Sequence, residues 1–175
     1  MTNERGFTLV EVLLAAVLTT VGLVGLLAVI PMASFAVQEG NQLSTATFLA
    51  NQKLEVARHM PWASSPAKDC LGISSTPTSS PRVPAGATCT LGATTINAGG
   101  LLPWFATESS SAIAGFPGYS RTVRVTDCGV PPGCGGITNP AIRSVTVTVT
   151  YRASSAVAIS AFTKPVAVTL MVAQR

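Results

Sequence analysis

The fold of this chain is decided by GFTLVEVLLAA, residues 6–16, where a long apolar segment begins. One acid, Glu11, lies within the first turns of that segment, and no charged residue follows it before Glu39. A charged side chain inside a membrane segment costs about 2.5 to 3.5 kcal/mol on insertion scales, so it marks a functional residue whose partner must be sought. We therefore take Glu11 as the first candidate site.

Residues 7–37 form the apolar segment itself, which would extend roughly 46 Å as a helix at about 1.5 Å per residue. Since a membrane-spanning helix needs about 20 residues, the segment is long enough to cross a bilayer. Pro31 lies inside it and predicts a kink. An ordinary secretory signal has its cleavage site after the apolar region, whereas here a polar leader precedes it.

Residues 38–60 continue the helix with an amphipathic pattern, and Met60-Pro61 predicts its end. The apolar positions recur at spacings of three and four and are Leu43, Ala46, Ala50, Leu54 and Ala57. Such a stripe is expected to pack on a globular head formed by residues 61–175. Within that head, residues 61–118 are rich in Pro, Ser, Thr and Gly and predict loops with one or two short elements.

The last third of the chain predicts an antiparallel sheet. Apolar and polar residues alternate strictly over Arg121–Asp127, Ser144–Tyr151 and Pro165–Val172, as in strands with one buried face. We expect that face to cover the stripe of the long helix. The predicted fold class is therefore α+β, with a long N-terminal membrane-spanning helix packed against a C-terminal antiparallel sheet.

The four cysteines all follow the apolar helix, which indicates disulfides in an oxidising compartment. Four cysteines allow three pairings, and we favour the local ones, Cys70 with Cys89 and Cys128 with Cys134, because Pro131-Pro132-Gly133 predicts a turn between the latter two. No Cys-x-x-Cys pair occurs and the only histidine is His59, so the sequence predicts no metal site.

The N-terminus resembles that of type IV prepilins and type II secretion pseudopilins, in which a short polar leader ends in Gly before Phe-Thr-Leu-(Val/Ile)-Glu and a long apolar helix. Residues 1–6 correspond to the leader and residues 7–37 to the membrane and filament-core helix. The resemblance implies cleavage by a prepilin peptidase between Gly6 and Phe7, N-methylation of Phe7, and a role for Glu11 in assembly. The α+β head is also what this family implies.

The resemblance implies partners and a location as well. The partners are other pilin or pseudopilin subunits, the prepilin peptidase, an inner-membrane assembly platform and, before assembly, the lipid bilayer. The protein would cross the bacterial inner membrane once, with a cytoplasmic N-terminus and a periplasmic head that reaches the cell surface in a pilus. Residues 49–55, LANQKLE, are similar to a stretch of PilV-type minor pilins and of minor pseudopilins.

Two interpretations of Glu11 remain open. It can pair between subunits with the amine that cleavage creates at Phe7, so that each charge offsets the other in an apolar filament core. It can instead be a helix N-terminal carboxylate favoured by the helix dipole, an effect of about 0.3 to 1 kcal/mol.

Catalysis finds no support in the sequence, which has no paired-carboxylate or nucleophile-elbow motif, and we expect neither an enzyme nor a cofactor. The head is basic, with eight Lys or Arg against three Asp or Glu beyond residue 60. Arg121 and Arg143 are candidates for a strip on the sheet that contacts DNA phosphates, although no nucleic-acid fold is recognisable.

We therefore expect a minor pilin or pseudopilin precursor, a structural subunit of a cell-envelope filament. The alternatives are a type II secretion pseudopilin, a DNA-binding uptake pilin of natural transformation, and a membrane-anchored binding protein that never polymerises. The sequence does not distinguish a pilus from a secretion machine, nor the tip of a filament from its shaft.

Overall fold

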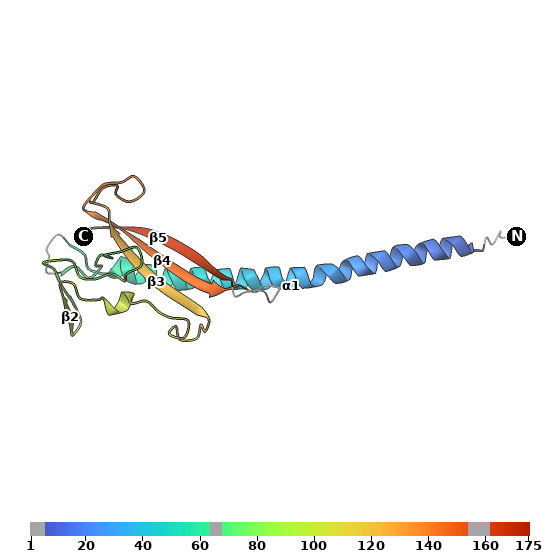
Figure 1. Ribbon diagram of the computed structural model, residues 1–175, viewed down its shortest axis with the longest axis horizontal. Coiled ribbons are helices and arrows are strands. Elements are labelled where there is room, and N and C mark those ends of the chain that lie inside the picture. The colour runs from blue at the N-terminus through green and yellow to red at the C-terminus, as the bar shows by residue number, and fades with distance from the viewer. Residues whose placement is uncertain (1–5, 64–67, 154–161) are drawn as a thin grey trace. The chain divides into compact units, whose positions relative to one another are not determined.

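The computed structural model describes residues 6–63, 68–153 and 162–175 (Figure 1). Its elements, in chain order, are the helix α1 (Leu9–His59), the strands β1 (Thr88–Leu91) and β2 (Thr94–Asn97), the 3-10 helix η2 (Pro103–Phe105), and the strands β3 (Tyr119–Asp127), β4 (Ile142–Arg152) and β5 (Thr163–Ala173). The described chain divides into two units, one up to Asn41 and one from Gln42 onward, and each is described by itself.

The first unit is the N-terminal part of α1. Helix α1 continues through Pro31, whose missing N–H leaves one carbonyl without its helical donor. Hydroxyl groups here bond within the helix: those of Thr19 and Ser34 donate to the carbonyls of Ala15 and Ile30, four residues earlier. This arrangement keeps the backbone of an apolar segment hydrogen-bonded without water.

The second unit contains the predicted sheet, in the order β3-β4-β5 with both pairs antiparallel. In its register Val123 lies opposite Val147, and Val147 lies opposite Val168. The three strands are those that alternation predicted. Strands β4 and β5 are longer at both ends, and β3 is longer at its start. The predicted α+β architecture, a long N-terminal apolar helix followed by antiparallel sheets, is confirmed.

The core of the second unit forms where the inward side chains of the sheet meet one stripe of α1. The buried stripe residues are Ala46, Leu49, Ala50, Leu54 and Ala57. Leu43 was expected in this stripe but is 48% exposed, since it precedes the part of α1 that the core covers. On the sheet the alternate residues Val145, Val147 and Val149 are fully buried.

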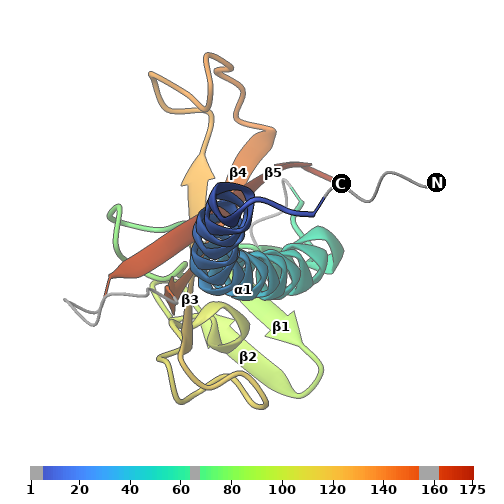
Figure 2. The same ribbon diagram turned by 90° about the vertical axis from the view of Figure 1, so that its right-hand side faces the viewer.

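Residues 88–97 form a hairpin of two short strands, in the region where the sequence predicts loops with one or two short elements. Strands β1 and β2 pair antiparallel with Cys89 opposite Ile96. Gly92 lies in their two-residue connection with φ of 58°, a conformation that favours glycine. Figure 2 shows this hairpin and the β3–β4 connection on opposite sides of the second unit.

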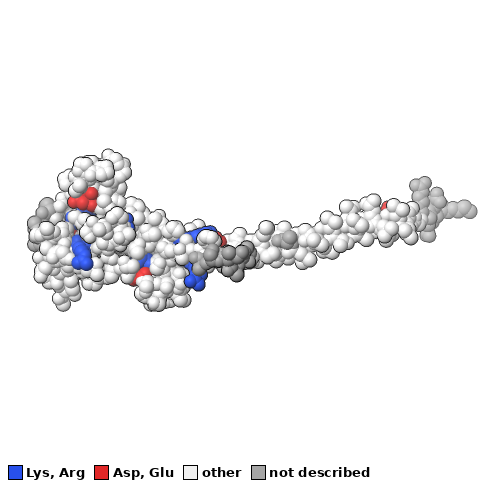
Figure 3. Space-filling view, in the orientation of Figure 1, with Lys and Arg blue, Asp and Glu red and all other residues white. Residues whose placement is uncertain are grey.

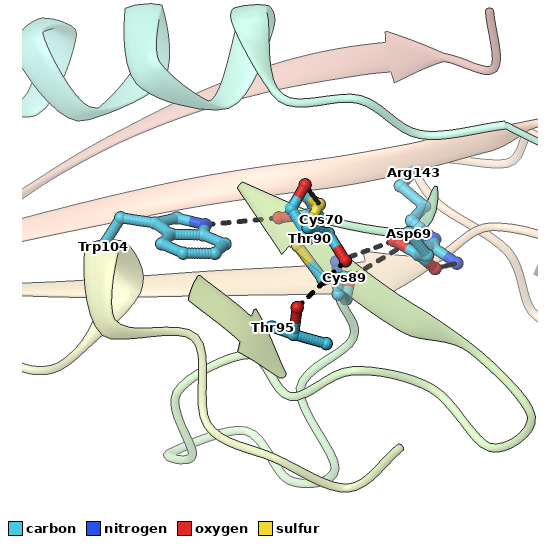
Figure 4. The surroundings of a disulfide bond; sticks show 8 residues. Asp69, Cys70, Cys89, Thr90, Thr95, Trp104 and Arg143 are labelled. Carbon is cyan, nitrogen blue, oxygen red and sulfur yellow. Dashed lines mark hydrogen bonds and ion pairs between the residues drawn. A yellow bond between two sulfur atoms is a disulfide. The ribbon is translucent and has the colours of Figure 1, made fainter. Parts of the chain in front are cut away.

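Two disulfides hold the irregular parts of the head, and they join the pairs that the sequence favoured. Cys70–Cys89 links the segment after α1 to β1, and the indole of Trp104 donates to the Cys70 carbonyl beside it (Figure 4). Cys128–Cys134 closes the β3–β4 connection. On the loop-entropy model the longer loop contributes about 3 kcal/mol and the shorter about 2 kcal/mol.

Candidate functional site: the N-terminal segment and the buried arginines

The start of α1 is capped by Thr8. The N–H of Glu11 bonds to the Thr8 hydroxyl at 3.3 Å and to the Thr8 carbonyl oxygen at 3.1 Å. Thr8 is therefore the N-cap and Glu11 the third helical residue, the spacing of a capping box. The Thr-x-x-Glu pattern carries this signal in the sequence, and the sequence analysis did not use it.

The carboxylate of Glu11 is exposed, and among the described residues it has no hydrogen-bond or ion-pair partner. Phe7, four residues before it, is 83% exposed. A methyl group added at Gly6 would meet no described atom within 4 Å, and Gly6 does not adopt a left-handed conformation. Neither packing nor backbone geometry in the described chain therefore requires glycine at this position.

The apolar side chains that follow Glu11 are exposed on every side of the helix. Large exposed residues include Leu13, Leu18, Val24 and Ile30. Figure 3 shows the corresponding surface almost wholly without charge. By length and composition α1 is the one helix among the described residues that is able to cross a membrane. A helix that is apolar all round requires lipid or neighbouring helices to cover it.

Residues 1–27 match the family model of the prokaryotic N-terminal methylation motif. The match spans Gly6, Phe7 and Glu11 and ends inside α1. It supports a type IV pilin-like or pseudopilin precursor, and together with the apolar helix it fits a membrane-anchored protein with an N-terminal anchor. No curated protein and no solved structure matches the chain.

Arg121 is buried at the start of β3, where its guanidinium joins the sheet to α1. Its Nε donates to Glu108 Oε2 at 2.6 Å, and one terminal nitrogen donates to both the Leu49 carbonyl and Gln52 Oε1 at 2.9 Å. Lys53 reaches the same Glu108 oxygen at 3.4 Å. This cluster, the Glu108 ion cluster, connects α1, β3 and the loop before β3.

The electrostatics of the Glu108 ion cluster lower the pKa of both Lys53 and Glu108. For Lys53, burial lowers the pKa, and the charge of Arg121 adds to this effect against the opposing charge of Glu108. For Glu108, burial raises the pKa, but the hydrogen bond from Arg121 and the positive charge of Lys53 outweigh it. Glu108 is thus held as a carboxylate between two cations.

Arg143 is buried on β4 in a second ion pair. Its two terminal nitrogens donate to the two carboxylate oxygens of Asp69 at 2.6 and 2.7 Å, as Figure 4 shows. The guanidinium also lies 4.5 Å from the ring centre of Trp62. Asp69 in turn accepts from the Gly72 N–H. The pair fixes the chain that leaves α1 against the sheet.

The expectation that Arg121 and Arg143 line a strip for DNA phosphates needs correction. Their exposed fractions are 4% and 6%, and both guanidinium groups are already paired with carboxylates inside the head. A phosphate cannot reach them without breaking a buried ion pair. Within the described residues, no group of three or more His, Cys, Asp or Glu side chains is placed to hold a metal ion.

Proposed function

We propose that this chain is the precursor of a structural subunit, a minor pilin or pseudopilin, of a cell-envelope filament. The observation that carries the proposal is the coincidence of the methylation motif with the N-terminal part of α1. Its apolar side chains are exposed there, and Glu11, the one acid before Glu39, has no partner among the described residues. Such a segment needs lipid or other helices around it, and a filament supplies the helices. The role is structural and not enzymatic.

Maturation would consist of cleavage between Gly6 and Phe7, followed by methylation of the new Phe7 amine. The lack of any described contact that requires glycine at position 6 supports a requirement imposed by another molecule, the peptidase. A side chain there would obstruct the extended backbone in a peptidase cleft. The exposed Phe7 is in turn accessible to a methyltransferase.

Assembly would then pair Glu11 of one subunit with the Phe7 amine of a neighbour. Helices that stack with an axial stagger bring these two groups together, and methylation keeps the amine charged. Each charge alone is costly in an apolar filament core, and a subunit in the wrong register would leave both unpaired. The capping by Thr8 uses the Glu11 N–H and leaves its carboxylate free for this role.

The location that follows is the bacterial inner membrane, with a cytoplasmic N-terminus and a periplasmic head that enters the filament on assembly. The two disulfides support an oxidising compartment for the head. The partners are other pilin or pseudopilin subunits, the prepilin peptidase and the assembly platform. The PilV-like stretch at residues 49–55 favours a minor subunit.

Intact-mass spectrometry of the membrane-purified protein from cells with and without prepilin peptidase tests the processing step. We expect loss of residues 1–6 and the gain of one methyl group only in cells with the peptidase. The variant Gly6→Ala should retain the leader, while the matched control Gly40→Ala, inside α1, should be processed normally. A chain that keeps residues 1–6 in the presence of the peptidase would contradict the proposal.

A further inference from the structure

The outer face of the β3–β4–β5 sheet, opposite the core, is lined with hydroxyl groups. Alternation along the strands turns the even-numbered residues of β3 and β4 and the odd-numbered residues of β5 to this face. Its polar residues include Thr122, Thr126, Ser144, Thr146, Thr148 and Thr169. None of these outward positions on the three strands holds an acid, and Arg124 is the cation at the middle of β3.

This face is hollowed on both sides of Thr126. One hollow of about 210 Å³ lies between Arg124 and the loop of residues 74–77. The other, of about 400 Å³, lies between Thr146 and residues 133–135 of the disulfide-closed connection. Because Thr126 lines both, the two hollows adjoin, and we call them together the threonine trough.

The walls of the threonine trough are fixed by bonds within the head. Ser74 pairs with the edge of β3, its N–H donating to the Val125 carbonyl at 2.8 Å while its hydroxyl accepts from the Val125 N–H at 3.1 Å. The opposite wall is closed by the Cys128–Cys134 disulfide. At Gly133, with φ of 76°, a side chain would collide with the Ile137 carbonyl oxygen, so the backbone packs closely here. A ligand would therefore meet a preformed surface.

Arg124 differs from the two buried arginines of the sheet. Arg121 and Arg143 point to the core face and are paired with carboxylates. Arg124 points to the trough, is half-buried, and within residues 68–153 and the other described segments its guanidinium makes no hydrogen bond or ion pair. Its donors are thus available to an anion, and a guanidinium binds a carboxylate through two parallel hydrogen bonds.

We propose that the threonine trough binds an acidic polysaccharide, with one sugar carboxylate on Arg124 and the neighbouring sugar hydroxyls on the Ser and Thr side chains. Charge density favours this class over nucleic acid. Double-stranded DNA carries one negative charge per about 1.7 Å, so its binding requires several cations along one track. The trough offers one guanidinium among many hydroxyls, which matches a chain with widely spaced carboxylates and hydroxyls of its own. The proposal does not depend on filament assembly.

Calorimetric titration of the full chain in detergent micelles with a hyaluronan oligosaccharide, in which carboxylated and uncharged sugars alternate, tests this site. The matched control is the same oligosaccharide with its carboxylates methyl-esterified. A duplex oligonucleotide is the third probe and tests for binding of nucleic acid. We expect the acidic oligosaccharide to bind and the ester to bind at least about tenfold more weakly, since a hydrogen bond to a charged group contributes about 1.5 to 3 kcal/mol. Equal binding of acid and ester, tighter binding of DNA, or no binding of the acid would overturn the proposal.

Arg124→Gln should weaken binding of the acidic oligosaccharide by about 10- to 100-fold, by the same conversion. Arg152→Gln is the charge-matched control, because Arg152 is an exposed cation at the far end of β4, and it should change binding by less than about twofold. Arg124→Lys keeps the charge but not the two parallel donors, so its binding of the acidic oligosaccharide should lie between that of the wild type and that of Arg124→Gln. It replaces Arg124→Gln in the test if that variant does not fold. Equal losses in Arg124→Gln and Arg152→Gln would show nonspecific charge attraction and overturn the site.

Discussion

The two halves of α1 differ in what surrounds them, although both are regular helix. In residues 9–41 most of the described apolar side chains are exposed, as at Leu18, which is 64% exposed. In residues 42–59 one stripe is covered by the head, as at Leu49, which is 1% exposed. Both halves are thus helical, but it is the second half that packs against the head of its own chain. The apolar surface of the first half has no partner among the described residues of its own chain, and our proposal assigns that role to other subunits.

Removal of a leucine from each half tests this contrast with the largest expected effect. Leu49→Ala should lower the free energy of unfolding of the head by about 2 to 5 kcal/mol, because it removes buried contacts and leaves a cavity. Leu18→Ala should change it by less than about 0.5 kcal/mol. Denaturant unfolding of the full chain in micelles, followed by Trp62 and Trp104 fluorescence, measures both. Similar losses of unfolding free energy in the two variants would contradict this contrast between the halves of α1.

Much of this architecture could be predicted, because it rests on periodic patterns. The strict alternation of β3, β4 and β5 predicted the sheet. The same alternation places Arg121 on the same face of the sheet as Val123 and Val125, and Arg143 on the same face as Val145. The burial of both arginines could therefore be predicted. The basic net charge of the head suggested a DNA-binding strip, but net charge does not show on which face of the sheet each arginine lies.

Other features were not predictable because their partners lie in segments without periodicity. Glu108 and Asp69, which neutralise the buried arginines, come from the irregular residues between α1 and β3. The sequence predicts one or two short elements in residues 61–118 but not their positions, because β1 and β2 are four residues long and largely exposed. At the N-terminus, by contrast, residues 6–11 carry the candidate site in one short motif.

A smaller effect concerns the Glu108 ion cluster, which ties the second half of α1 to the head. Because the folded state holds the pKa of Glu108 below its ordinary value of about 4.3, the unfolded state binds more protons as the pH falls. The stabilisation is complete above about pH 5 and is lost as the pH falls through the folded pKa. The difference in melting temperature between the wild type and Glu108→Gln should therefore shrink below about pH 4.

Glu55→Gln is the control for this pH dependence, since Glu55 pairs with Arg58 on the exposed side of α1. The difference in melting temperature between Glu55→Gln and the wild type should stay nearly constant over the same pH range. If the difference in melting temperature between Glu108→Gln and the wild type stays constant or grows on acidification, Glu108 is not held as a carboxylate by Lys53 and Arg121.

The central claim, that the bare half of α1 is completed by other subunits through Glu11, is tested most directly by the incorporation of Glu11→Gln into filaments. Sheared filaments and the membrane fraction are compared for the wild type, Glu11→Gln and the control Glu55→Gln, with intact mass to show processing. We predict that Glu11→Gln is inserted, cleaved and methylated but is absent from filaments, whereas Glu55→Gln is incorporated normally. Incorporation of processed Glu11→Gln at the wild-type level would contradict the account.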